Sequence, residues 1–271
     1  MNDTTEEQPH QLTAAEPAAV RVVQITDCHI FATEEECLQG WNTRQSFTAV
    51  SNAAIERSAR LDLLLATGDL SQDGTGASYD YLAQRFDDIG VPSFWLPGNH
   101  DDIDAIRGHF KGKWIHASKH VLIGGWQIVL LNSTIKGQVY GRVATAQLEF
   151  LSRALNAYPD RHALVCLHHQ ALDSGSEWLD LKGLKGSAQL RAQLALHDNV
   201  RAVLWGHVHQ ESDQIIDDIL WMSTPSSCVQ FKPGSKEFAL GSEAPGYRHL
   251  RLYADGNIES AVHRVRGLEK T

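Results

Sequence analysis

The stretch VRVVQITDCH, residues 20–29, decides the fold because it joins a buried strand to a pair of metal-binding side chains. Its apolar run is typical of a β-strand, and Asp27 and His29 follow where that strand ends. Four more places repeat this order: LDLLLATGD (61–69), SFWLPGNHD (93–101), HALVCLHH (162–169) and VRAVLWGHVH (200–209). Polar side chains just beyond the carboxyl ends of strands form the usual ligand site of an α/β protein. The sequence therefore predicts an α/β enzyme with a metal pair.

Taken singly, each of these pieces is weak evidence for a metal. Asp-x-His and Gly-Asp occur in many turns, and His168-His169 alone could be a surface pair at a strand end. Their number, their order and their shared position after strands favour one common site. We therefore expect the five loops to meet in space.

Between these strands the pattern alternates between strand and helix. Apolar residues at helical spacing predict helices near 43–60, 76–89, 144–157 and 187–197. The pair Gly124-Gly125 predicts the turn of a hairpin between strands 119–123 and 126–132. Residues 213–264 show only strand-like runs. This arrangement predicts a mixed architecture, with two sheets packed together and helices outside.

The chain of 271 residues is long enough for one large domain or two small ones. The metal motifs spread over residues 27–209, so any division would split the site, and no Pro/Gly/Ser-rich linker separates two halves. We predict a single folded domain over residues 20–271. Residues 1–19 are acidic and polar, and we predict that they form a disordered tail.

Charge and composition argue against several classes of partner. A formal net charge of −9 disfavours a nucleic acid polymer or an anionic membrane as the main partner. No apolar stretch has the length of a transmembrane helix, and the N-terminus lacks the features of a signal peptide. The four cysteines lie singly, which fits reduced thiols in a cytoplasm. We expect a cytoplasmic protein that acts on a small molecule.

The five motifs D-x-H, G-D, G-N-H-D, H and G-H-x-H stand in this order between residues 27 and 209. This set resembles the calcineurin-like metallophosphoesterases. Within that family the chain is similar to the bacterial class III cyclic-AMP phosphodiesterases. The closer resemblance lies in VVQITDCHIF, LLATGDLSQD, WLPGNHDD, LHHQAL and the stretch that begins STPSSCVQFKPG, and it covers nearly the whole chain after residue 20. It implies a four-layer αββα sandwich of two mixed sheets in a single domain, which periodicity alone does not distinguish from one doubly wound sheet.

The resemblance also implies the ligands of two divalent cations. One cation would take Asp27, His29, Asp69 and His209, and the other would take Asp69, Asn99, His168 and His207. Asp69 would bridge the pair, and His169 is the alternative to His168. Oxygen and imidazole donors without thiolate suit Fe²⁺ or Mn²⁺ above all, and Zn²⁺ as well.

The activity that the resemblance implies is hydrolysis of 3′,5′-cyclic AMP to 5′-AMP. A metal-bridging hydroxide would attack phosphorus, and His100, which is not among the ligands, would act as the general acid. The substrate would bind against His29, Asp69, Asn99, His100 and His209. Two other hypotheses are a phosphodiesterase or phosphomonoesterase of broad specificity and a binding scaffold without turnover. We expect a monomer or a homodimer.

One position departs from the family pattern. Many members carry an acid three residues after the bridging Asp that orients the catalytic histidine, but this chain has Gln72 there and Asp73 next to it. Asp101 is predicted to support the site or cap a helix. The nucleoside side is predicted to be lined by loops 178–180, 226–228 and 246–248, where Trp178 could stack on a base. Lys232 and Arg248 are candidates to meet phosphate. The alternatives are surface charges without a role and, for Trp178, a buried or interface side chain.

Overall fold

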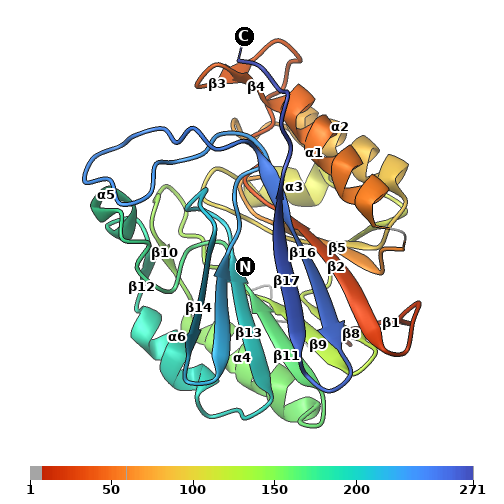
Figure 1. The fold of residues 1–271 in the computed structure, drawn as a ribbon. Coiled ribbons are helices and arrows are strands. Elements are labelled where there is room, and N and C mark those ends of the chain that lie inside the picture. The colour runs from red at the N-terminus through yellow and green to blue at the C-terminus, as the bar shows by residue number, and fades with distance from the viewer. Residues whose placement is uncertain (1–7, 59, 271) are drawn as a thin grey trace.

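Two mixed β-sheets form the centre of the molecule (Figure 1). The computed structural model describes residues 8–58 and 60–270. The first sheet has six strands, in the spatial order β17 (Ile258–Arg264), β16 (Gly246–Tyr253), β2 (Ala19–Ile25), β5 (Leu63–Thr67), β6 (Ser93–Leu96) and β7 (Ile115–His116). The second has seven, in the order β1 (His10–Leu12), β8 (His120–Ile123), β9 (Trp126–Leu130), β11 (His162–Cys166), β13 (Val200–Trp205), β15 (Ile219–Ser223) and β14 (Ser212–Ile216).

Helices cover the outer face of each sheet, so the predicted αββα sandwich is confirmed. The six-stranded sheet packs against α1 (Thr43–Arg57), α2 (Gly76–Ile89) and α3 (Ile103–His109). The seven-stranded sheet packs against α4 (Thr145–Ala157), α5 (Glu177–Asp180) and α6 (Ser187–Leu194). Two short pairs complete the elements: β3 (Cys37–Leu38) with β4 (Trp41–Asn42), and β10 (Gly141–Arg142) with β12 (Leu184–Lys185).

Strand alternation divides the apolar residues among three cores. In β2, Val22 faces the core between the sheets, whereas Val23 faces the helices. In β11, Leu164 faces the core between the sheets, and Val165 lies on the opposite side beneath α4 and α6. Strands that are apolar on both faces are buried on both faces, which is why these runs showed no polar alternation in the sequence.

The sequence located several elements well. Helix α2 has the predicted bounds because Thr75 caps its start, Gly90 ends it at a φ of 71°, and its apolar residues recur at helical spacing. The hairpin of β8 and β9 turns at Gly124-Gly125 as predicted. The tail prediction is wrong for residues 10–12, because β1 pairs in parallel with β8 and the ring of His10 packs on Phe94. The N-terminal part of that predicted tail, residues 1–7, lies outside the described residues.

Helix α3 was not predicted, because only seven residues form it. The side chain of Asp102 accepts hydrogen bonds from the backbone N–H groups of Asp104 and Ala105 and so starts the helix directly after the Gly-Asn-His-Asp motif. Among the described residues, no helix combines the length and the apolar composition needed to cross a membrane.

Candidate metal centre

The loops that follow five strands meet at one shared edge of the two sheets. Loops after β2, β5 and β6 come from the six-stranded sheet, and loops after β11 and β13 come from the seven-stranded sheet. Most of the predicted ligands here are buried, and Asn99 is half-buried. The buried ones are Asp27, His29, Asp69, His168, His207 and His209. Both sheets therefore supply donors to one site, as the position of the motifs predicted.

Three side chains form the first group of donors. His209 Nε2 lies 3.3 Å from Asp27 Oδ1 and 3.2 Å from His29 Nε2. Atoms bound to one cation at about 2.0–2.2 Å stand about 3 Å apart. The spacing of these three side chains therefore fits a shared cation.

A second group of donors lies on the other side of Asp69. His168 Nε2 is 3.4 Å from Asp69 Oδ2, and His29 Nε2 approaches the same oxygen at 3.9 Å. Asn99 Oδ1, His168 Nε2 and His207 Nε2 are buried and have no hydrogen-bond partner among the described residues. Buried polar atoms are almost always paired, so these three unpaired atoms fit metal ligands. Of the three, His168 Nε2 lies within 4.0 Å of both carboxylates. Asp69 lies between the two groups, where a bridging carboxylate is needed.

In three of the four candidate ligand rings, the far nitrogen is held by a neighbour. His168 Nδ1 lies 2.9 Å from the carbonyl oxygen of Thr67, and His209 Nδ1 lies 2.7 Å from that of Val229. A carbonyl oxygen only accepts, so Nδ1 must carry the proton and Nε2 is left with a free lone pair. His29 makes the equivalent contact, with its Nδ1 2.7 Å from Gln72 Oε1. All three rings thus present Nε2 to the centre.

The backbone of the ligand loops is strained. Asp27, His29, Asp69, His207 and His209 all have positive φ angles, between 47° and 65°. Residues other than glycine rarely adopt this conformation, and such strain concentrates at functional sites. Cross-loop hydrogen bonds stabilise it: the backbone N–H of Asp27 donates to Gly68 at 3.0 Å, and that of His29 donates to Asp69 at 2.9 Å.

Two further contacts join the loops. The backbone N–H of His207 donates to the carboxylate of Asp27, at 3.0 Å from Oδ2, and so joins the two sheets at the site. Asp101 accepts from the N–H groups of Gly98 and Leu70 and from the Tyr79 hydroxyl. Asp101 therefore supports the loops, as predicted.

Glycine is required where these loops touch. A Cβ on Gly98 would lie against the backbone and carboxylate of Asp69, at 2.8 Å from Cγ. Gly68 has a φ of 94°, and a Cβ there would lie 2.8 Å from the ring of His168. The Gly-Asp and Gly-Asn-His-Asp motifs thus begin with glycine because the loops approach each other too closely for a side chain.

Burial and the carboxylates set the charges of the site. Burial lowers the pKa of His29 to about 3 and holds that of His207 well below its ordinary value. Burial also lowers the pKa of His168, but the carboxylates of Asp69 and Asp27 outweigh it and raise that pKa to about 9. Since Nδ1 of His168 faces a carbonyl, the added proton sits on Nε2, the atom that a cation would take.

His169 differs from its neighbour. Its Nδ1 lies 2.8 Å from the Ser133 hydroxyl and its Nε2 lies 3.1 Å from the carbonyl oxygen of Val139. Both ring nitrogens are thereby engaged, whereas Nε2 of His168 is unpartnered among the described residues. This contrast favours His168 over His169 as a ligand.

His100 lies at the rim of the centre, and its side chain is exposed. Its ring packs edge-on to His29 with 5.0 Å between centroids, and no described residue makes a hydrogen bond to it. In the family pattern, the residue three positions after the bridging Asp orients the catalytic histidine. Here that residue is Gln72, and it contacts His29 rather than His100. Asp73 accepts from Thr75 within its own turn and from Ala32 in the loop after β2, so it does not take that role either.

Two of the three segments predicted to line the nucleoside side, 226–228 and 246–248, are buried in the fold. Arg248 is fully buried and bonds to Thr224 and to the backbone oxygen of Ser223, so it does not meet phosphate. The segment 226–228 is also buried. Trp178 packs edge-on to Phe231 and donates to Ser235 at 3.1 Å. The sequence also gave no sign that Phe231 stacks on His209, with 4.1 Å between centroids.

Known proteins show the same fold and much of the same sequence. The family model of the calcineurin-like phosphoesterases matches residues 20–211 of this chain. The chain is 42% identical over 255 residues to the 3′,5′-cyclic adenosine monophosphate phosphodiesterase CpdA of Escherichia coli (strain K12), covering 94% of this chain and 93% of that protein. It is 38% identical over 250 residues to a 3′,5′-cyclic-nucleotide phosphodiesterase of Nostoc, covering 92% and 94%. A dimetal phosphatase from Danio rerio shares the fold, with a TM-score of 0.61 at 13% identity over 92% of this chain and 100% of that one.

Proposed function

The protein belongs to the calcineurin-like phosphoesterase family, and we propose that it is a dinuclear phosphodiesterase that hydrolyses 3′,5′-cyclic AMP to 5′-AMP. The observation that carries the proposal is the convergence of the orphaned donor atoms of Asn99, His168 and His207 with two buried carboxylates, beside an exposed histidine. The names of the Escherichia coli and Nostoc relatives, which cover more than nine-tenths of this chain, support the choice of substrate.

The donor set suits two divalent cations such as Fe²⁺ or Mn²⁺. Asp27, His29, Asp69 and His209 would hold one, and Asp69, Asn99, His168 and His207 would hold the other. Bound there, the pair would supply a nucleophilic hydroxide at neutral pH and neutralise charge on the phosphoryl oxygens. The two carboxylates offset only half of the charge of two such cations, so the site would attract an anionic diester despite the net charge of −9.

His100 has the position required of a general acid. The alkoxide that leaves the phosphorus needs a proton, and a donor must come within about 2.6–3.2 Å of that oxygen. Nitrogen atoms of His100 and His29 and an oxygen of Asp69 lie within 4.8 Å of one another. The ring is exposed and has no hydrogen-bond partner among the described residues, so it is free to turn toward a bound substrate. The phosphate would rest against His29, Asp69, Asn99, His100 and His209.

A substrate panel tests the proposal. Metal-stripped protein is reconstituted with Mn²⁺, Fe²⁺ or Zn²⁺ and given 3′,5′-cyclic AMP, 2′,3′-cyclic AMP and a nitrophenyl diester. We expect kcat/KM to be highest for 3′,5′-cyclic AMP. Equal rates on all three would instead indicate a phosphoesterase of broad specificity, and no turnover with any metal would indicate a binding scaffold.

A further inference from the structure

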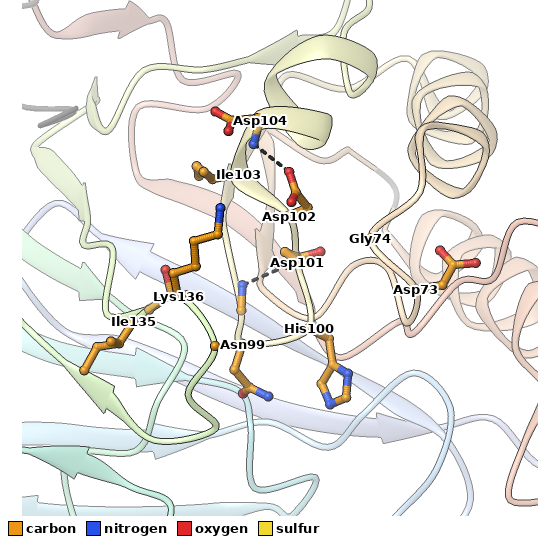
Figure 2. Close-up of a pocket in the computed structure, with 13 residues that line it drawn as sticks. Asp73, Gly74, Asn99, His100, Asp101, Asp102, Ile103, Asp104, Ile135 and Lys136 are labelled. Carbon is orange, nitrogen blue, oxygen red and sulfur yellow. Dashed lines mark hydrogen bonds between the residues drawn. The ribbon is translucent and has the colours of Figure 1, made fainter.

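A cavity of about 430 Å³ opens beside His100 and Asn99. One wall is the start of α3, with Asp102, Ile103 and Asp104, and the opposite wall is the loop that follows β9, residues 134–137. Figure 2 shows Asn99 and His100 at one end of this cavity, and the Lys136 ammonium pointing toward Ile103 and Asp104 at the other. Its volume lies within the range of about 300–1,000 Å³ that is usual for small-molecule sites.

The chemistry of the reaction directs the nucleoside into this cavity. Hydrolysis of a 3′,5′-cyclic nucleotide to a 5′-nucleotide breaks the bond between phosphorus and the ribose 3′-oxygen. The general acid must touch that oxygen, so the ribose lies against His100 and the base extends beyond it. The cavity that has His100 in its wall therefore lies where the ribose and the base would extend. A second cavity of about 540 Å³ is lined by His209, Gln230 and Glu243, but His100 is not in its wall.

The walls suit a purine. Ile103 and Ile135 are half-buried apolar side chains that can cover the faces of a flat ring. Most polar groups of the cavity are already engaged: Asp102 caps α3, and Asp101 binds backbone N–H groups. Lys136 and Asp104 have exposed side chains without a partner among the described residues. They leave one donor and one acceptor to meet the edge of a base.

We propose that this cavity is the nucleobase subsite, with Ile135 against the ring and Lys136 donating a hydrogen bond to a ring nitrogen. The proposal rests on the proposed function, because it takes the leaving oxygen to be the ribose 3′-oxygen. It also replaces the sequence-based placement of the base near residues 178–180, 226–228 and 246–248. The last two segments are buried, and Trp178 packs on Phe231.

The test compares two ligands that share a phosphate and differ in the nucleoside. The dissociation constants of 5′-AMP and inorganic phosphate are measured by titration calorimetry on Mn²⁺-loaded protein. We expect Lys136→Ala and Ile135→Ala to weaken 5′-AMP about tenfold, the lower end for a bond to a charged group, and to leave phosphate within about twofold. Val139→Ala is the matched control, because Val139 is exposed on the same loop and does not line the cavity.

Three results would overturn the proposal: unchanged 5′-AMP binding in both variants, equal weakening of 5′-AMP and phosphate, or selective weakening of 5′-AMP by Glu243→Ala in the second cavity. Lys136 is exposed, so its replacement keeps the test valid even if Ile135→Ala unfolds the loop. A wild-type protein that cleaves a nitrophenyl diester but not 3′,5′-cyclic AMP would refute the proposed substrate. The two binding constants would still report on the cavity.

Discussion

Replacing His100 by alanine separates proton donation from metal binding. The exposed ring makes no hydrogen bond to a described residue and only an edge contact with His29. Removal of such a surface side chain changes stability by no more than about 0.5 kcal/mol. None of the donor atoms assigned to the two cations belongs to His100. We therefore expect the variant to fold normally and to keep two metal ions per chain.

Unlike stability and metal content, the rate of hydrolysis should fall steeply in His100→Ala. Loss of a general acid costs about 10²- to 10⁴-fold, which corresponds to roughly 2.7–5.5 kcal/mol of transition-state stabilisation. The loss should be large for 3′,5′-cyclic AMP, because its leaving alkoxide needs a proton. It should shrink for a nitrophenyl diester, whose phenolate leaves without one. The dependence on leaving group is thus the signature of proton donation.

The assay measures kcat on both substrates, with metal content from elemental analysis and stability from thermal melting. His29→Ala serves as the matched control, because loss of a ligand should remove metal and depress both substrates alike. If His100→Ala lowered both rates equally while keeping its metals, donation to the leaving group would be refuted. His100 would then be a residue that positions phosphate.

Four further substitutions test the rest of the site and the fold. Asp69→Asn removes the bridging charge, so elemental analysis should find fewer than two metal ions per chain; a full pair in the folded variant would exclude the bridge. His168→Ala should deplete one metal ion, whereas His169→Ala should keep both and lower only the melting temperature, and the reverse pattern would exchange their roles. Arg248→Met strands buried acceptors and should lower the free energy of unfolding by about 2–5 kcal/mol in urea with little change in kcat at a temperature where the variant is folded. If Arg248→Met were as stable as the wild-type protein but had a raised KM, Arg248 would have a role in phosphate binding.

The sequence predicted the strand ends well because their information is local. An apolar run followed at once by Asp, His or Asn shows both the strand and the ligand in about ten residues. Helix α2 has its predicted bounds because its capping residues, Thr75 and Gly90, are also local signals. The position of β1 could not be predicted, since three residues with one large apolar side chain give no periodic signal. Only the free edge of β8, distant in sequence, makes that segment a strand.

The supports of the ligands were hidden from the sequence for a related reason. Backbone carbonyl groups hold the rings of His168 and His209. Because every residue has a carbonyl group, no residue type in the sequence marks these partners. Gln72 departs from the family's acid at its position and contacts His29, and this contact depends on how two loops cross rather than on spacing along the chain. Arg248 looked like a surface charge, yet it is buried, where it bonds to the Thr224 hydroxyl and the Ser223 carbonyl oxygen and pairs with the Asp213 carboxylate at 2.8 Å.

The strained loops show how the fold prepares the site before a cation arrives. Each residue with positive φ costs on the order of 1–3 kcal/mol, and five of the candidate ligands share this conformation. Relaxing one loop would break its hydrogen bonds to the next, such as that from Asp27 to Gly68, and would separate the two sheets where His207 donates to Asp27. The strain persists because the loops hold one another. The spacing of about 3 Å among donor atoms is therefore set by backbone that a single loop, taken alone, would not maintain.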